Sequence, residues 1–484
     1  MATKPVRALL ITSNGAGMGH LSRMLAVALA AGPGADATLL SLSVALPTVT
    51  AHGLAGEYCP STERRFMPDH LWHRYLRRRL VALAEEIDAQ VVAFDGVAPY
   101  PGLIASRRHL SAVPMVWIRR GMWRPGVNDH QLAKSALFDL IIEPGDLAAA
   151  GDCGPTAGRG DAQRVPPITQ VDVIDRPGRP VAAAELGIDP DRPTALVTLG
   201  TGLTGDVVGP GGVAVAALLE DRRWQVCVTR STIAEHAVPV IDPTRVIELR
   251  DVYPLARYLG VFDAVVSSAG YNAVHEFLPA GLPTLLIANT ATRTDDQVAR
   301  AQWLADAGLA LSALPDDLAA IAGSARMLSD DAVRGDLAAS CAALPAARRT
   351  GGAAAAARLV MAQPAIGARP VTMSQRLGWL GSAAREEVKR LIGPGATELA
   401  RTVLGRPPSG GIRHRLSVAL TGSGSDAAAA PEVRRLVFGE SIPAEQIAAG
   451  PVIEHLLAGS SAIYRAARLD IIHDAYRVVD QPKS

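Results

Sequence analysis

The residues best suited to hold a phosphate lie in one turn between a predicted strand and a predicted helix. The apolar run 263–266 is followed by Ser267, Ser268 and Gly270, and a helical pattern then covers 271–280. Free N–H groups and the positive dipole end at a helix start favour a phosphate or diphosphate. Ser268 and Gly270 are therefore candidate phosphate ligands, although an ordinary strand–helix crossover would need a similar turn.

Carboxylates and an amide near this turn could bind sugar hydroxyls. Glu276 lies about one and a half turns into the helix, where it can reach only a group beside the phosphate. A carboxylate there can accept hydrogen bonds from two vicinal hydroxyls, as a ribose offers. Asp295, Asp296 and Gln297 follow the next predicted strand, 283–287, at the same edge of the sheet. These side chains are expected to hold sugar hydroxyls.

A second glycine-rich turn follows the first predicted strand, 6–12. It contains Gly15, Gly17 and Gly19 and ends in His20 at the start of a helical pattern. The spacing differs from the G-x-G-x-x-G dinucleotide fingerprint. The glycines let backbone approach a ligand, and a histidine titrates near neutral pH. His20 is thus either an acid–base group or an ordinary residue at a helix start.

Asp95 is the other acid–base candidate of the N-terminal part. It ends the predicted strand 90–94, and in an open α/β sheet that end faces the ligand crevice. We therefore expect Asp95 to act as a base or to bind an acceptor.

Two segments combine arginines with aromatic residues. In Arg64–Arg79, Trp72 falls on an apolar helical stripe and the arginines should form the solvated face. Such a face usually has no specific partner, but it could contact an anionic membrane or a phosphorylated acceptor. The loop Arg119–Arg124, with Trp123, suits an anionic or sugar acceptor, or is a basic surface loop.

Length and composition place limits on the class of protein. The 484 residues suffice for two or three domains, and 48 Lys+Arg against 47 Asp+Glu do not suggest a nucleic-acid partner. The four cysteines have no metal-ligand spacing. We find no signal peptide or transmembrane run, and we expect a cytoplasmic protein.

Strands and helices alternate along most of the chain, which predicts α/β architecture with two Rossmann-like, doubly wound parallel sheets facing a cleft. Gly, Pro, Asp and Arg interrupt this pattern after residue 150. We expect an N-terminal domain at 1–165, a linker at 166–185 and a second domain at 186–362. Residues 363–484 should form a mainly helical extension of unknown role.

The stretch from 265 to 297 resembles the donor-binding half of GT-B glycosyltransferases. It is most similar to family 28, whose members include the transferase that adds N-acetylglucosamine to the lipid-linked muramyl precursor of peptidoglycan. The turn at 15–20 resembles the N-terminal loop that borders the acceptor cleft in that family. The two motifs occur in the same order, and the resemblance covers roughly residues 6 to 360.

The resemblance implies a role for each candidate position. By this resemblance, Ser268, Gly270, Thr201 and Gly202 would bind the diphosphate, and Glu276 would bind the ribose. Asp296 and Gln297 would bind the donor sugar, and backbone groups at Val252 would bind the base. Gly17 and Gly19 would border the acceptor cleft. Some members have two glutamines at the positions of Asp296 and Gln297.

The resemblance further implies an inverting, metal-independent transfer from a UDP-sugar, with His20 or Asp95 as the base and no cofactor. The acceptor would be a glycan or lipid-linked molecule, and the enzyme could lie at the inner face of the plasma membrane. Asp189-Pro-Asp191 precedes a strand and is expected to be a turn, unlike the metal-binding Asp-x-Asp of the other major glycosyltransferase fold. A nucleotide-sugar 2-epimerase and a non-catalytic nucleotide-sugar-binding protein remain alternatives.

Overall fold

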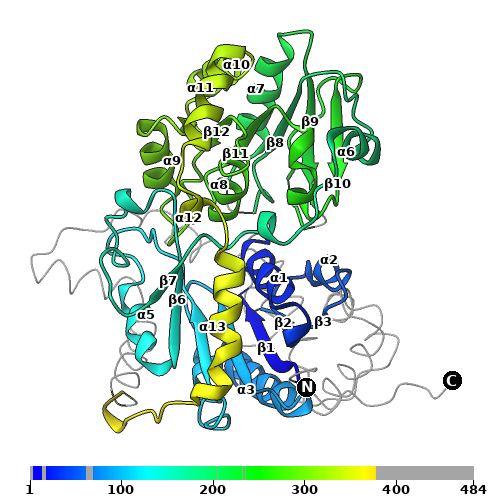
Figure 1. Cartoon of the computed structure of the whole chain (residues 1–484). Helices are drawn as coiled ribbons and strands as arrows, with labels where there is room; N and C mark the ends of the chain where they lie inside the picture. The colour runs from blue at the N-terminus through cyan, green and yellow to red at the C-terminus, as the bar shows by residue number, and fades with distance from the viewer. Residues whose placement is uncertain are drawn as a thin grey trace, which may run out of the picture.

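The computed structural model describes residues 4–13, 18–61, 69–203, 205–231, 233–234, 236–375 and 377. These residues form two lobes, each built on a parallel sheet (Figure 1). The first sheet has seven strands in the order β3-β2-β1-β4-β5-β6-β7, and the second has six in the order β10-β9-β8-β11-β12-β13. The two predicted doubly wound sheets are therefore confirmed.

The strands of the first sheet are β1 (Val6–Thr12), β2 (Ala35–Ser41), β3 (Ala55–Tyr58), β4 (Val91–Asp95), β5 (Met115–Ile118), β6 (Leu140–Pro144) and β7 (Gln163–Val165). Those of the second are β8 (Thr194–Thr198), β9 (Gln225–Arg230), β10 (Val246–Arg250), β11 (Ala264–Ser268), β12 (Thr284–Ile287) and β13 (Leu311–Ala313). The central strands are apolar and buried on both faces, because helices cover both sides of a parallel sheet.

The α-helices are α1 (Gly19–Ala31), α2 (Leu46–Thr50), α3 (Asp69–Glu86), α4 (Pro101–Ser106), α5 (Asp129–Leu132), α6 (Arg179–Leu186), α7 (Val208–Leu219), α8 (Tyr271–Phe277), α9 (Gln297–Asp306), α10 (Leu318–Met327), α11 (Asp331–Ala342), α12 (Ala346–Arg349) and α13 (Gly352–Ile366). Short 3₁₀ helices are η1 (Gly32–Gly34), η3 (Ala133–Leu137), η4 (Ala149–Gly151), η5 (Gln170–Asp172) and η6 (Leu255–Val261).

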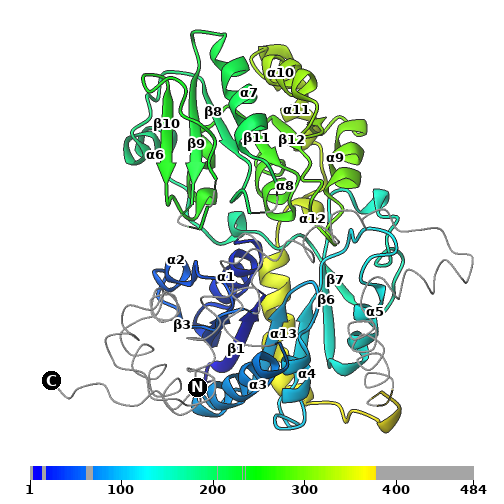
Figure 2. The same ribbon diagram turned by 180° about the vertical axis from the view of Figure 1, so that it is seen from behind.

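Helix α13 returns from the second lobe to the first. In both ribbon views it lies along the lobe that carries β1 (Figures 1 and 2). Ala353, Ala356 and Val360 of this helix share a buried core cluster with Leu10 and Leu25. The predicted range 186–362 thus includes a helix that packs on the first sheet. Most of the expected extension 363–484 lies outside the described residues.

Helix α3 carries part of the predicted basic face. Trp72 and the leucines of its stripe pack inward, as expected. Arg79, however, is buried and forms an ion pair with Glu57, so it does not belong to the solvated face. Arg74 and Arg78 are exposed, whereas Arg64 lies outside the described residues. Among the helices of the described part, none is long and apolar enough to span a bilayer.

The return of α13 brings backbone into close contact at Gly352. A Cβ atom at this position would lie 2.1 Å from the Pro167 carbonyl oxygen, whereas one at Gly323, in α10, would meet no atom within 4 Å. Gly352→Ala should therefore lower the free energy of unfolding by about 1–3 kcal/mol through overpacking. Gly323→Ala is the matched helical control and should be neutral or stabilising. Equal urea midpoints for the two variants would contradict this close packing.

Candidate active site

Several of the predicted site residues that the structure describes lie where the two lobes meet. In a parallel α/β sheet the loops at the carboxyl ends of the strands form the ligand crevice. Asp95 ends β4 of the first sheet and Ser268 ends β11 of the second. Helix α8 of the second lobe lies across the junction from α1 of the first (Figure 1).

His20, Asp95 and Arg23 form a buried cluster on the first lobe. His20 Nδ1 lies 2.6 Å from Asp95 Oδ1. Arg23 donates from Nε to Asp95 Oδ2 at 2.8 Å and from Nη2 to Oδ1 at 2.6 Å. His20 and Arg23 are three residues apart in α1 and therefore project from the same helix face. The structure brings together the two predicted acid–base residues and adds an arginine that we had not singled out.

The two acid–base candidates, Asp95 and His20, have different protonation states in this cluster. Burial would raise the pKa of Asp95, but Arg23 and His20 outweigh it and hold that pKa at about 2, so the carboxylate is ionised and can only accept hydrogen bonds. Burial lowers the pKa of His20, which is therefore neutral at pH 7. Arg23 Nη2 also lies 2.8 Å from Nδ1. Nδ1 carries the proton and donates it to Asp95, because this contact is the shorter one and Arg23 Nη2 already donates to the carboxylate. Nε2 of His20 then remains as a proton acceptor.

The same arginine links the two lobes. Arg23 Nη1 donates to Asn272 Oδ1 at 3.1 Å, and Asn272 Nδ2 donates to the Gly19 carbonyl at 3.2 Å. The Arg23 guanidinium also lies 5.3 Å from the centre of the Tyr271 ring, within cation–π range. The Tyr271 hydroxyl donates to the Gly145 carbonyl at 3.0 Å. The histidine–aspartate pair is thus held by residues from both lobes.

A second ionic cluster at the junction centres on Arg300, at the buried side of α9. Its Nε donates to Asp146 Oδ2 at 3.0 Å and its Nη2 to Asp295 Oδ1 at 2.9 Å. Arg120 of the first lobe reaches the same Asp295 oxygen at 3.3 Å. Asp295 was predicted to bind a sugar, but here it mainly balances these two cations.

The predicted phosphate turn and ribose ligand adjoin α8. Gly270 has an extended backbone and is the residue before the helix, with no side chain capping it. Ser268 is half-buried. Glu276 is only 8 % exposed and forms no hydrogen bond with any described residue. Burial raises its pKa to about 8. An uncompensated carboxyl of this kind is costly to maintain and is suited to a polar ligand.

Asp296 and Gln297 are beside this turn, but both side chains already have partners. Asp296 caps α9 by accepting from the Ala299 amide at 3.1 Å. Gln297 Oε1 accepts from the Asn289 amide at 3.1 Å, and its Nε2 faces Gly270. A structural role is therefore clear for both, and their contact with a donor sugar stays a prediction.

The remaining candidates lie on neighbouring loops. Thr201 and Gly202 follow β8, which pairs with β11. Gly202 has φ of 71°, a conformation that favours glycine, and a Cβ there would lie 2.9 Å from His236. Val252 follows β10 and is half-buried. Gly17 lies outside the described residues, whereas the Gly19 carbonyl accepts from Asn272 as noted above.

The loop Arg119–Arg124 differs from the expected acceptor surface. Trp123 is 2 % exposed and belongs to a core cluster, so its ring cannot stack on a sugar. Arg119 is fully buried and forms ion pairs with Glu143 and Asp161. Arg124 donates to the Thr290 carbonyl of the second lobe at 2.9 Å. Trp123 and Arg119 are therefore structural residues of the first lobe, and Arg124 joins the lobes. The pattern of charges alone could not distinguish these roles from acceptor binding.

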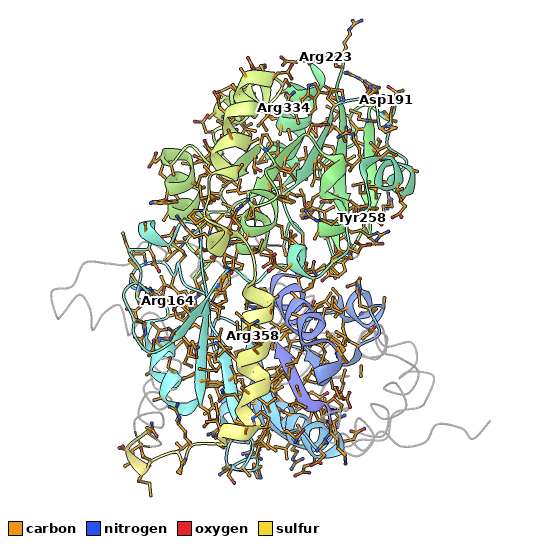
Figure 3. The ribbon with its side chains drawn as sticks, in the orientation of Figure 1. Arg164, Asp191, Arg223, Tyr258, Arg334 and Arg358 are labelled. Atoms are coloured by element: carbon orange, nitrogen blue, oxygen red, sulfur yellow. The ribbon has the colours of Figure 1, made fainter. Side chains whose placement is uncertain are left out.

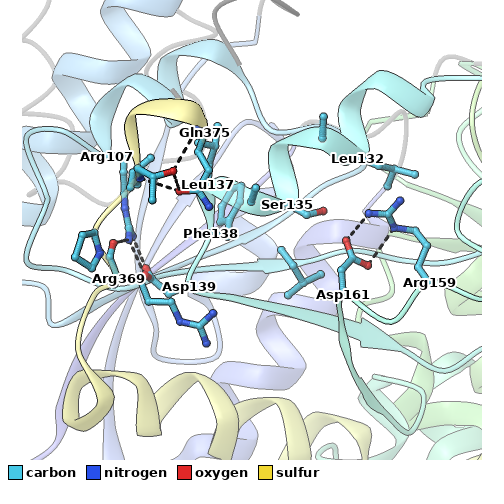
Figure 4. A pocket seen from close by; sticks show the side chains of 16 residues that line it. Arg107, Leu132, Ser135, Leu137, Phe138, Asp139, Arg159, Asp161, Arg369 and Gln375 are labelled. Carbon is cyan, nitrogen blue, oxygen red and sulfur yellow. Dashed lines mark hydrogen bonds and ion pairs between the residues drawn. The ribbon is translucent and has the colours of Figure 1, made fainter. Parts of the chain in front are cut away.

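Other features lie away from the junction. A cavity of about 500 Å³ lies within the first lobe, between Phe138, Asp161 and the segment after α13 that contains Arg369 (Figure 4). Asp189 caps a turn by accepting from the Asp191 amide at 3.0 Å, as expected, and Asp191 is at the far end of the second lobe (Figure 3). Among the described residues, no group of three or more His, Cys, Asp or Glu side chains is arranged to hold a metal.

His275 of the second lobe forms a hydrogen bond to the first lobe that requires one particular tautomer of its ring. Its Nε2 accepts from the Leu147 amide at 2.9 Å, so the proton is on Nδ1, which donates to the Tyr271 carbonyl at 2.6 Å. Burial lowers its pKa to about 4. The unfolded chain therefore binds this proton at a higher pH than the folded chain does.

His275 should consequently make stability depend on pH. Its contribution is present above its unfolded pKa and is lost as pH falls toward 4. His275→Gln retains a side-chain acceptor but cannot titrate. The stability difference between wild type and this variant should fall by about 2 kcal/mol from pH 6.5 to 4.5. Urea unfolding at both pH values measures it, and parallel curves would mean that the imidazole is not held neutral.

Part of this chain is similar in sequence to known transferases. No family model matches the chain. Over 212 residues it is 32 % identical to the UDP-N-acetylglucosamine–N-acetylmuramyl-(pentapeptide) pyrophosphoryl-undecaprenol N-acetylglucosamine transferase of Clavibacter sepedonicus, covering 43 % of this chain and 53 % of the relative. The transferase of the same name from Leifsonia xyli subsp. xyli is 30 % identical over 217 residues, which cover 44 % of this chain and 56 % of the relative. The chain thus spans about half the length of the curated relatives it matches.

A solved structure supports the same fold. The glycotransferase of kitacinnamycin superposes on 74 % of this chain and 99 % of its own, with a TM-score of 0.51 and 17 % identity. At that identity the likeness concerns the fold and not the substrate. The predicted resemblance is therefore confirmed: the chain has the two-lobed GT-B fold, and part of its sequence is similar to the N-acetylglucosaminyltransferases of lipid-linked muramyl precursors.

Proposed function

We propose that this protein is a glycosyltransferase that transfers a sugar from a UDP-sugar to an acceptor hydroxyl, with inversion and without a metal or other cofactor. The donor would bind to the second lobe, with its diphosphate at Ser268, Gly270 and the loop after β8. The acceptor would approach from the first lobe, beside His20.

The observation that carries this proposal is the unpartnered carboxyl of Glu276. It is buried on the helix that follows the Gly270 turn, and it forms no hydrogen bond with a described residue. A ribose would supply two hydroxyl donors to it, while the adjacent phosphates met the backbone N–H groups before α8. Nucleotide binding would thus satisfy a group that the free protein leaves unsatisfied.

The neutral imidazole of His20 provides the proton acceptor. Its Nε2 would take the proton of the acceptor hydroxyl as that oxygen attacks the anomeric carbon. The bond from the anomeric carbon to the diphosphate oxygen breaks, and its electron pair leaves with UDP. Asp95 would keep the proton of His20 on Nδ1 and stabilise the imidazolium that forms, much as the acid of a catalytic triad does. Asp95 is then a positioning residue and His20 the base.

The relatives suggest the chemistry of the substrates. Their names specify UDP-N-acetylglucosamine and a pyrophosphoryl-undecaprenol acceptor. We propose the same donor class and a lipid-linked acceptor for this chain. Such an acceptor would place the protein at the inner face of the plasma membrane, where exposed Arg74 and Arg78 of α3 could contact anionic lipid.

Product analysis with purified protein tests the reaction. Incubation with UDP-N-acetylglucosamine and a lipid-linked muramyl acceptor should yield UDP and a glycosylated lipid, and a chelator should not reduce the rate. His20→Ala should lower kcat by about 10²–10⁴-fold, and Asp95→Asn should lower it as well. A changed sugar nucleotide without transfer would indicate an epimerase. Binding without any product would indicate a sensor.

Glu276 should link nucleotide binding to proton release. With a pKa of about 8 in the free protein, its carboxyl is mostly protonated at pH 7, and ribose hydroxyls that donate to it favour the ionised form. UDP binding at pH 7 should therefore release a proton, and affinity should rise between pH 6 and 8.5. Calorimetry in buffers of different ionisation enthalpy measures this. Glu276→Gln should abolish the added proton release and weaken binding by about 1–3 kcal/mol. Equal release by the variant would remove Glu276 from the site.

A further inference from the structure

Arg120 is an incompletely paired cation at the junction of the lobes. A guanidinium has five N–H donors. The hydrogen bond of Arg120 to a described residue is the one from Nη1 to Asp295 Oδ1, at 3.3 Å. Its Nε is buried without a hydrogen-bond partner, and its side chain is 15 % exposed. By contrast, Arg23 and Arg300 each donate from all three of their nitrogens.

The acidic groups around Arg120 are committed to other cations. Asp95 is bound by Arg23 through two hydrogen bonds. Asp295 receives a shorter bond from Arg300, at 2.9 Å, than from Arg120, and Arg300 also binds Asp146. Asp295 would therefore stay paired if Arg120 moved to another anion. The neutral histidines His20 and His275 add no charge here.

Arg120 lies near both the proposed donor site, through Tyr271, and the proposed base His20. Its guanidinium lies 5.7 Å from the centre of the Tyr271 ring. Tyr271 is the first residue of α8 and directly follows Gly270. Arg120 also lies close enough to His20 to lower the pKa of that imidazole. The cation thus lies near the residue that follows the predicted phosphate turn and within electrostatic range of the proposed base.

We propose that Arg120, although it belongs to the first lobe, binds the diphosphate of the donor and stabilises the charge that develops on it as the glycosidic bond breaks. This inference rests on the proposed function and adds a residue from the opposite lobe to the donor site. An arginine matches phosphate geometry with paired N–H donors, and such charge-assisted bonds are strong in a buried setting. The bond to Asp295 holds the side chain ready in the free protein.

The proposal predicts a selective loss of phosphate recognition. Arg120→Gln should weaken UDP binding by about 10- to 100-fold. It should weaken uridine binding by less than about twofold, because uridine has no phosphate. Arg120→Lys should recover part of the UDP affinity, since charge remains but the paired donors are lost. Calorimetry on the full chain at fixed salt measures the affinities of the wild type and both variants for UDP and uridine.

Arg124→Gln is the matched control. Arg124 comes from the same loop, carries the same charge and also donates to the second lobe, but its bond goes to the Thr290 carbonyl. This variant should leave UDP affinity within about twofold of wild type. A general loosening of the junction would instead weaken binding in both variants, and it would weaken UDP binding and uridine binding alike.

The outcomes separate this proposal from the function on which it rests. UDP affinity that is unchanged in Arg120→Gln would overturn the role of Arg120 and leave the donor site of the second lobe intact. A higher KM for the lipid-linked acceptor in that variant, with unchanged UDP affinity, would overturn the donor assignment in favour of the acceptor phosphate. A wild-type protein that binds neither UDP nor uridine would refute the proposed donor site, and the role of Arg120 with it.

Discussion

The ion pair between Arg23 and Asp95 is the interaction on which the junction depends. It is almost completely buried, so neither charge could be tolerated there without the other. Arg23 and His20 together keep the pKa of Asp95 low, so Asp95 stays ionised, whereas burial lowers the pKa of His20 and keeps the imidazole neutral. The remaining donor of Arg23 reaches Asn272 on the other lobe. One guanidinium therefore holds the carboxylate that orients the proposed base and also connects that cluster to the second lobe.

Burial of so many charges between two lobes is expensive unless each is paired. Desolvation of an ion pair often cancels its Coulomb attraction, so the Arg300 cluster with Asp146 and Asp295 is better explained by geometry than by stability. Paired guanidinium and carboxylate groups have few alternative arrangements. They fix Asp295 and, through the backbone beside it, the start of α9. Among the described charged groups of these clusters and of α8, Glu276 and part of Arg120 still lack hydrogen-bond partners, which suits them to contact a ligand.

The sequence predicted the sheets and the proposed donor turn, because these depend on local patterns. Strand runs, a turn of small residues and a glutamate at fixed helical spacing can be recognised without tertiary information. The sequence did not predict the contacts at the junction between the lobes.

Arg23 could have been noticed, since it lies one helical turn from His20. Its partner Asn272, however, is 249 residues away in the sequence, so their contact depends on the tertiary fold. Likewise, the charges of Arg119 and Arg79 looked solvent-facing, because their acidic partners come from distant strands and loops. Trp123 is another such case, a core residue within a loop that resembled a binding surface.

The return of α13 has a consequence for how the lobes can move. The chain passes between them twice, after β7 and again before α13, and the two passages touch. The Gly351 amide donates to Asp172 at 2.7 Å, and Gly352 packs directly on the Pro166 and Pro167 carbonyls. Two passages bonded side by side resist twisting far more than a single linker would. Bending about the line through Asp172 and Gly351 is therefore the relative motion that we expect to be easiest.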